Sequence, residues 1–171
     1  NSRFIAENIK IPLFEQFGRD EPFWAPPLFH MIAAFVYMLF KSEFAVKMIS
    51  PIFGSLTLIL FFVVAKKLFG RKTAFYSVLF LAFVPLHLDY SVFSYIDGML
   101  SFLILLSVYF ALNNKIAASV IEAVLAILTK YNGIFILPAL FYIVYENNRN
   151  RRIFLKKVFI LSLISLLIGS V

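Results

Sequence analysis

Long runs of apolar residues, separated by short polar turns, make up most of this 171-residue chain. A membrane-spanning helix needs about 20 predominantly apolar residues, within a range of about 17–25. The pattern therefore predicts an all-α, polytopic transmembrane helical bundle of about six spans. The expected spans are Phe44–Ala65, Thr73–Leu88, Gly98–Leu112, Ile116–Thr129, Tyr131–Tyr145 and Ile153–Val171. We expect residues 1–171 to form a single core, in which residues 44–171 hold the spans.

Residues 1–43 are expected to contribute interfacial helices on the outer side of the membrane. Trp24–Phe40 contains two adjacent prolines and His30, and its Trp and Tyr side chains suit the membrane–water interface. Asn1–Phe17 is amphipathic enough for a second interfacial helix. A true span over Trp24–Phe40 is the alternative, because its length reaches the lower limit of about 17 residues.

Composition supports the membrane class. Hydrophobic residues make up 62% of the chain and charged residues 15%, against about 45–50% and about 25% in soluble domains. The chain starts at Asn1 and ends inside an apolar run, so we expect it to be part of a longer protein. The net charge of +7 comes from basic residues that flank apolar segments, which indicates orientation in a bilayer and no nucleic-acid partner.

The distribution of charge predicts which loops face the cytoplasm, because cytoplasmic loops carry an excess of Lys and Arg. Ten of the sixteen basic residues fall on one side if Ile116–Thr129 and Tyr131–Tyr145 are separate spans. These ten residues are Lys66, Lys67, Arg71, Lys72, Lys115, Arg149, Arg151, Arg152, Lys156 and Lys157. A single long span over 116–145 breaks this agreement, so the sequence predicts a helical hairpin there.

Lys130 lies at the tip of this predicted hairpin, in the stretch "TKYNG". Each arm, at 1.5 Å per residue, reaches only about 21–22 Å, which is less than the roughly 30 Å of the hydrocarbon core. The tip is therefore expected below the outer membrane surface, where a lysine needs a cavity, a partner or a route to the interface. It either snorkels to the interface or lines a cleft that an anionic lipid headgroup enters, and we favour the cleft.

Three polar stretches are expected on the outer side: "GRDEPFWAPPLFH" (Gly18–His30), "PLHLDYSVFSYIDG" (Pro85–Gly98) and "TKYNG" (Thr129–Gly133). Asp97 has two readings of equal weight, a functional acid and a member of a capping box that Ser94 begins. Asp20 and Glu21 form an adjacent acidic pair that can bind a divalent cation or act as a base. His30 has no second His or Cys at ligand spacing, so no metal site is predicted.

The order of several motifs resembles a known family. These are a double proline before an interfacial helix, an "LFGRK" turn, the "PLHLDYSVFSYIDG" loop and the "TKYNG" hairpin. Together they resemble the polyprenyl-phosphate-sugar-dependent membrane glycosyltransferases of the C-type fold. The similarity is to the protein mannosyltransferase and aminoarabinose transferase branches, and it covers roughly residues 22–140.

The resemblance implies a multi-pass membrane enzyme that is active on the extracytoplasmic side of the cell membrane or endoplasmic reticulum. It would move a sugar from a polyprenyl-phosphate carrier to a protein, lipid or glycan acceptor. An acid of the family's first outer loop would lie before Asn1. Asp97 matches a loop acid and is the catalytic candidate. The candidates for binding the substrates are Lys130, Tyr131, Pro26, Pro27, Tyr90, His30 and Glu21.

Two other classes remain open at this point. A transporter or lipid flippase would also use intramembrane charges such as Lys130 and Glu122, but it should place them at the midplane with access to both faces. A structural membrane subunit would explain the hydropathy but not the sunken hairpin tip. No phosphate-binding glycine loop, nucleophile elbow or zinc-protease helix is present in the sequence.

Overall fold

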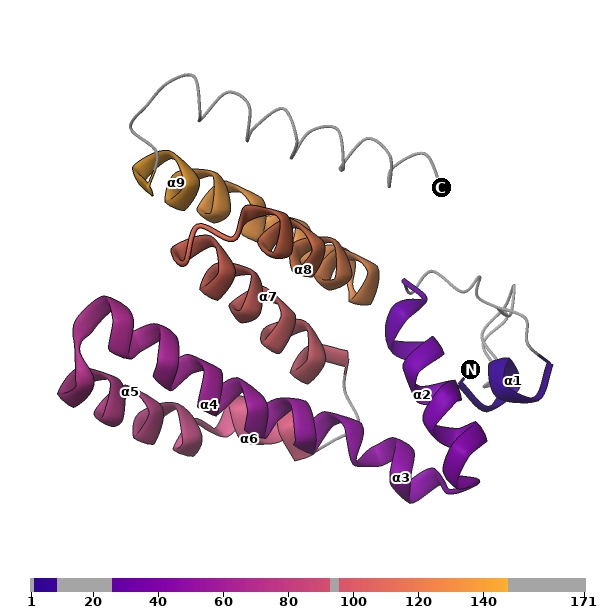
Figure 1. Ribbon diagram of the computed structural model, residues 1–171. Coiled ribbons are helices and arrows are strands. Elements are labelled where there is room, and N and C mark those ends of the chain that lie inside the picture. The colour runs from indigo at the N-terminus through magenta and orange to yellow at the C-terminus, as the bar shows by residue number, and fades with distance from the viewer. Residues whose placement is uncertain (1, 9–25, 93–95, 148–171) are drawn as a thin grey trace.

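The computed structural model describes residues 2–8, 26–92 and 96–147, and every regular element in this part is helical (Figure 1). The elements are α1 (Ser2–Asn8), α2 (Leu28–Phe40), α3 (Glu43–Lys47), α4 (Ile49–Phe69), α5 (Arg71–Phe83), α6 (Pro85–Val92), α7 (Ile96–Leu112), α8 (Ile116–Thr129), the 3₁₀ helix η1 (Tyr131–Ile136) and α9 (Leu137–Asn147). The all-α prediction is confirmed for these residues. The predicted span Ile153–Val171 lies outside them.

The longest helical unit joins α3 and α4 across Met48 and covers Glu43–Phe69, 27 residues in all. Met48 marks a local irregularity because Pro51 has no amide hydrogen to donate to the carbonyl four residues earlier. The Met48 and Ile52 amides still donate to carbonyls four residues back, each at 3.1 Å, so the axis continues. In the described part, this is the one unbroken helix long and apolar enough to cross a membrane.

The expected span Thr73–Leu88 is instead two helices, α5 and α6, bent by 67° at their junction. Val84 adopts an extended conformation (φ −67°, ψ 121°), which the ring of the following proline favours in the residue before it. Pro85 then begins α6. The prediction of one straight span is corrected here: α5 and α6 form either one broken span or a re-entrant segment.

The predicted number of spans is not confirmed. The described residues hold one helix of sufficient length, or two if α5 and α6 count together. The apolar helices α2, α7 and α8 have 13, 17 and 14 residues, so none of them reaches the usual length of about 20.

The antiparallel turn of the predicted hairpin is confirmed, whereas two separate membrane spans there are not. Helix α8 ends at Thr129, and the chain then turns through η1 into α9. Val144 of α9 packs with Ile116 and Val120 near the start of α8, and Leu140 packs with Ala123. The two arms are therefore antiparallel, although the second arm begins as a 3₁₀ helix and not as the α-helix expected from Tyr131.

Small side chains lie where the helices meet. Ala33 of α2 and Ala126 of α8 are completely buried in a cluster that also contains Met99 and Leu103 of α7. Small residues let helix backbones approach closely, and in lipid this packing drives helix association. Large apolar side chains such as Phe80, 76% exposed, cover the outside instead. Figure 1 shows the resulting order, with α7 between α4 and α8.

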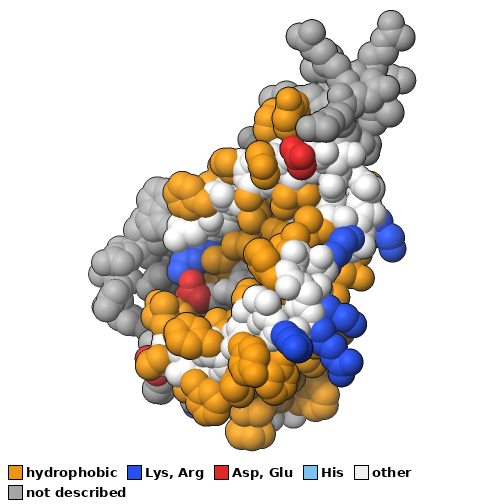
Figure 2. Space-filling model, turned by 90° about the vertical axis from the view of Figure 1, so that its left-hand side faces the viewer, with side chains coloured by type: hydrophobic (Ala, Val, Ile, Leu, Met, Phe, Trp, Pro, Cys, Tyr) orange, Lys and Arg blue, Asp and Glu red, His pale blue; other side chains and the backbone are white. Residues whose placement is uncertain are grey.

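The bundle has two chemically different ends. At the first, which we name the basic end, lie the α4–α5 and α7–α8 turns with Lys66, Lys67, Arg71, Lys72 and Lys115. The Lys67 ammonium donates hydrogen bonds to the Leu112 carbonyl at 2.8 Å and the Asn113 side-chain oxygen at 2.7 Å, tying the two turns together. Figure 2 looks onto this end and shows Lys and Arg side chains gathered beside a largely apolar surface.

Candidate functional site

The first turn of α7 and the last residues of α8 meet at the opposite end of the bundle, where they bring two charged side chains together. The Lys130 ammonium donates a hydrogen bond to Oδ1 of Asp97 at 2.7 Å. The side chains are 39% and 26% exposed, respectively. The catalytic candidate and the principal binding candidate of the sequence are therefore direct partners.

Lys130 reaches this position because α8 stops one residue earlier. Its backbone is extended (φ −155°, ψ 135°), and its amide still donates to the Ala126 carbonyl at 3.0 Å. Gly133 then closes the turn, and its amide donates to the Lys130 carbonyl at 2.8 Å. A Cβ at Gly133 would lie 2.6 Å from the Ala126 carbonyl carbon. The close return of the chain therefore requires glycine and fixes the hairpin tip.

The ion pair with Asp97 explains how Lys130 is accommodated at the tip of the hairpin. Of the three possibilities, a cavity, a partner or a route to the interface, the structure supplies a partner. Asp97 lies in the first turn of α7, where a carboxylate is also stabilised by the helix dipole. Ser94, the first residue of the predicted capping box, lies outside the described residues. Asp97 thus has a structural role in the ion pair whatever else it does.

The other predicted site residues do not all join this pair. Tyr131 follows Lys130 and is 62% exposed. Pro26 is buried, Pro27 precedes α2, and His30 packs edge-on against Phe29 with ring centroids 5.8 Å apart. Glu21 and the acidic pair that it forms with Asp20 lie outside the described residues.

Tyr90 lines a pocket of about 200 Å³ between α4, α5, α6 and α7. Gly98, the neighbour of Asp97, lines the same pocket, so the pocket lies next to the first turn of α7. Hydroxyl and imidazole groups predominate among its polar lining residues: Thr57, His87, Tyr90, Ser91 and Ser101. Such groups suit hydrogen bonds to a hydroxyl-rich ligand.

Sequence reasoning missed four of these lining residues: Thr57, His87, Ser91 and Ser101. The available signal was the recurrence of small polar residues at helical spacing inside apolar runs. Gly54 and Thr57 are three residues apart on α4, and Gly98 and Ser101 repeat that spacing on α7. Small residues at such spacing mark close helix contacts in membranes.

The described residues contain no group of three or more His, Asp or Glu side chains that could hold a metal ion. Glu122 lies in the middle of α8 and is only partly buried, so it takes no defined role. Among the described residues, the Asp97–Lys130 pair offers one carboxylate and one ammonium group, and the neighbouring pocket adds hydroxyl and imidazole groups.

The helices are apolar, expose large side chains and pack through small residues, and their charge pair lies at one end. These features together are those of an integral membrane protein. A family model described as dolichyl-phosphate-mannose-protein mannosyltransferase matches residues 24–171. The chain belongs to this family, which consists of membrane glycosyltransferases. No curated protein and no solved structure matches the sequence or the fold of this chain.

Proposed function

We propose that this chain forms the membrane core of a glycosyltransferase that takes a sugar from a polyprenyl-phosphate carrier. The family description supports a dolichyl-phosphate-linked mannose donor and a protein acceptor, while a lipid or glycan acceptor is the broader alternative. The observation that carries the site assignment is the 2.7 Å contact between Lys130 and Asp97. It places a cation suited to phosphate beside a carboxylate suited to deprotonating a hydroxyl.

The proposed orientation has the basic end in the cytoplasm and the Asp97–Lys130 end on the extracytoplasmic side. Four basic residues in the α4–α5 turn and one in the α7–α8 turn support this orientation. The Lys67 bonds to Leu112 and Asn113 support the placement of both turns on one side of the membrane. The carrier phosphate would then meet Lys130 near the outer headgroups while its polyprenyl chain stays in lipid.

In this proposal, Lys130 binds the carrier phosphate through charge-assisted hydrogen bonds. Its side chain is 39% exposed, so an incoming phosphate can reach it. Partly exposed ion pairs contribute only about 0–1 kcal/mol, so a phosphate of equal or greater charge can compete with Asp97 for the ammonium group. Donor binding would then release the carboxylate at the place where it is needed.

Asp97 acts as the general base in the transfer step. Its carboxylate takes the proton of the acceptor hydroxyl, and that oxygen forms a bond to the anomeric carbon of the sugar. The bond between this carbon and the phosphate oxygen breaks, and its electron pair leaves with the polyprenyl phosphate. Lys130 stabilises the charge of the leaving phosphate. The pocket beside Gly98, which has hydroxyl groups among its mostly apolar lining, supports a place for the sugar or the acceptor in the same step.

The test compares variants of the full-length enzyme in proteoliposomes with a polyprenyl-phosphate-linked mannose donor. Lys130→Ala should raise the KM for the donor at least about tenfold, and Asp97→Asn should lower kcat by about 10²–10⁴. Lys115→Ala, which removes a lysine at the basic end, is the matched control and should leave both constants unchanged. Wild-type transfer by Lys130→Ala would remove this residue from the site. Carrier movement across the bilayer with no transfer by the unaltered protein would instead support the transporter or flippase alternative.

A further inference from the structure

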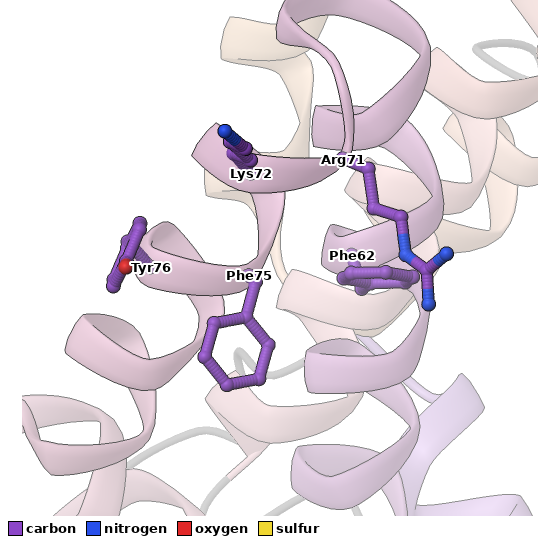
Figure 3. A pocket seen from close by; sticks show the side chains of 5 residues that line it. All are labelled: Phe62, Arg71, Lys72, Phe75 and Tyr76. Carbon is purple, nitrogen blue, oxygen red and sulfur yellow. The ribbon is translucent and has the colours of Figure 1, made fainter.

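A second pocket, of about 290 Å³, lies at the basic end, between α4 and α5. Its lining combines two cations, Arg71 and Lys72, with three aromatic rings, Phe62, Phe75 and Tyr76. Figure 3 shows Phe75 in the middle, Arg71 and Phe62 on one side, and Lys72 and Tyr76 on the other. This pocket is far from the Asp97–Lys130 pair in the fold, because it lies at the opposite end of the helices.

From this geometry we propose that the pocket binds the headgroup of an anionic phospholipid of the cytoplasmic leaflet. The inference rests on the membrane orientation proposed above. It does not rest on the proposed transfer chemistry. The ligand is a phosphodiester headgroup with its acyl chains, and the pocket holds it through Arg71 and Lys72.

The charges of the pocket are available for a ligand. In the described part of the chain, no carboxylate forms an ion pair with Arg71 or Lys72. Lys67, by contrast, is already engaged by the Leu112 carbonyl and the Asn113 side chain. The guanidinium of arginine matches the oxygens of a phosphate in a bidentate geometry. Around the α4–α5 turn, Lys67 therefore has a structural role, whereas Arg71 and Lys72 have no anionic partner among the described residues.

An exposed apolar strip leads away from these cations along α5. Phe75, Leu79 and Phe83 follow one another at four-residue spacing and are 59%, 47% and 73% exposed. Residues four apart lie on one face of a helix, so the strip gives acyl chains a continuous contact. A soluble anion would use the cations but not this strip, which is why the occupant is a lipid and not free phosphate.

The size and position of the pocket agree with a headgroup. Its volume of about 290 Å³ lies just below the range of about 300–1,000 Å³ for whole small-molecule sites, as suits the headgroup alone. Basic pockets between helices on the cytoplasmic side bind anionic headgroups, and each basic residue near such a surface contributes about 1 kcal/mol. Two cations in one pocket therefore favour an anionic lipid over a zwitterionic one.

The first experiment measures lipid preference directly. Full-length protein is reconstituted in phosphatidylcholine with a minor fraction of spin-labelled phosphatidylglycerol, and the motionally restricted lipid is quantified against spin-labelled phosphatidylcholine. The preference for phosphatidylglycerol should fall at least about fivefold in Arg71→Gln/Lys72→Gln, a lower bound equivalent to the contribution of about 1 kcal/mol from one of the two cations. Lys115→Gln, the control, removes an exposed charge from the same end outside the pocket and should keep the preference. An unchanged preference in the double variant, or an equal loss in the control, overturns the proposal.

A second measurement uses only the unaltered protein, so it does not depend on the folding of a variant. A photoactivatable phosphatidylglycerol should cross-link to the segment 62–76, whereas a phosphatidylcholine with the same photoactivatable chain should not. Equal labelling by both lipids, displacement by equimolar inorganic phosphate, or cross-links to other segments would overturn the assignment. Sugar transfer is measured in the same vesicles. Loss of transfer with retained cross-linking would count against the proposed function alone.

Discussion

At the scale of single residues, the position of Lys130 depends on neighbours that are close in sequence. The end of α8, the extended backbone of Lys130 and the close return at Gly133 all lie within a few residues of one another. The position of this turn was predicted from the stretch "TKYNG", whereas the close return at Gly133 was not. The ion-pair partner of Lys130 could not be predicted in this way, because Asp97 is 33 residues away and meets Lys130 only through the packing of α7 on α8.

A charge reversal separates the structural role of this pair from its proposed chemistry. Asp97→Lys or Lys130→Asp alone places like charges together and should lower the thermal midpoint of unfolding. The double variant restores opposite charges, and the coupling measured for contacting residues is about 0.5–3 kcal/mol. Sugar transfer should remain lost in the double variant, since its carboxylate now projects from position 130, just after α8. Full transfer by the double variant would reduce the pair to a structural contact, and no recovery of stability would show that the contact does not form.

At the scale of the helices, the sequence predicted the bounds of those helices that begin and end at polar turns. The bounds of α8 agree with the predicted Ile116–Thr129, and the first span of Phe44–Ala65 lies within Glu43–Phe69. The break at Val84 was missed because hydropathy does not register the effect of Pro85 on the residue before it. Likewise, an apolar run does not distinguish the 3₁₀ turn of η1 from an α-helix.

The contact between α4 and α6 can be tested by a double-mutant cycle. A Cβ at Gly54 would collide with the side chain of Ser91. Gly54→Ala should therefore destabilise the protein by about 1–3 kcal/mol, the usual cost of overpacking. Ser91→Gly removes the colliding atoms, so Gly54→Ala/Ser91→Gly should recover most of this loss. Thermal unfolding in detergent measures all four members of the cycle. Additive losses in the double variant would place Ser91 away from Gly54.

At the scale of the whole molecule, the two ends differ in charge and in chemistry. Lysines and an arginine gather at the α4–α5 and α7–α8 turns, whereas the ion pair lies where α7 begins and α8 has ended. The distribution of basic residues predicted this separation, because it depends only on the parity of the helices. The two pockets could not be predicted in the same way, since their walls come from helices that pack only in three dimensions.

Site-directed labelling tests the proposed orientation. These 171 residues contain no cysteine, so a thiol introduced at one chosen position is the single thiol within them. Thr73→Cys at the basic end should be protected from a membrane-impermeant maleimide in intact cells, and Asn132→Cys at the hairpin tip should react. Both residues are exposed in the fold. Permeabilised cells provide the control, in which both should react, and the reverse pattern in intact cells would invert the orientation.

The 14 residues of α8 have a consequence for the surrounding lipid. At 1.5 Å per residue this helix is about 21 Å long, so it falls short of the hydrocarbon thickness by about a third. Bilayers adapt to short segments by thinning locally. The membrane should therefore be thinner around the hairpin, which would admit water to the charges at its tip.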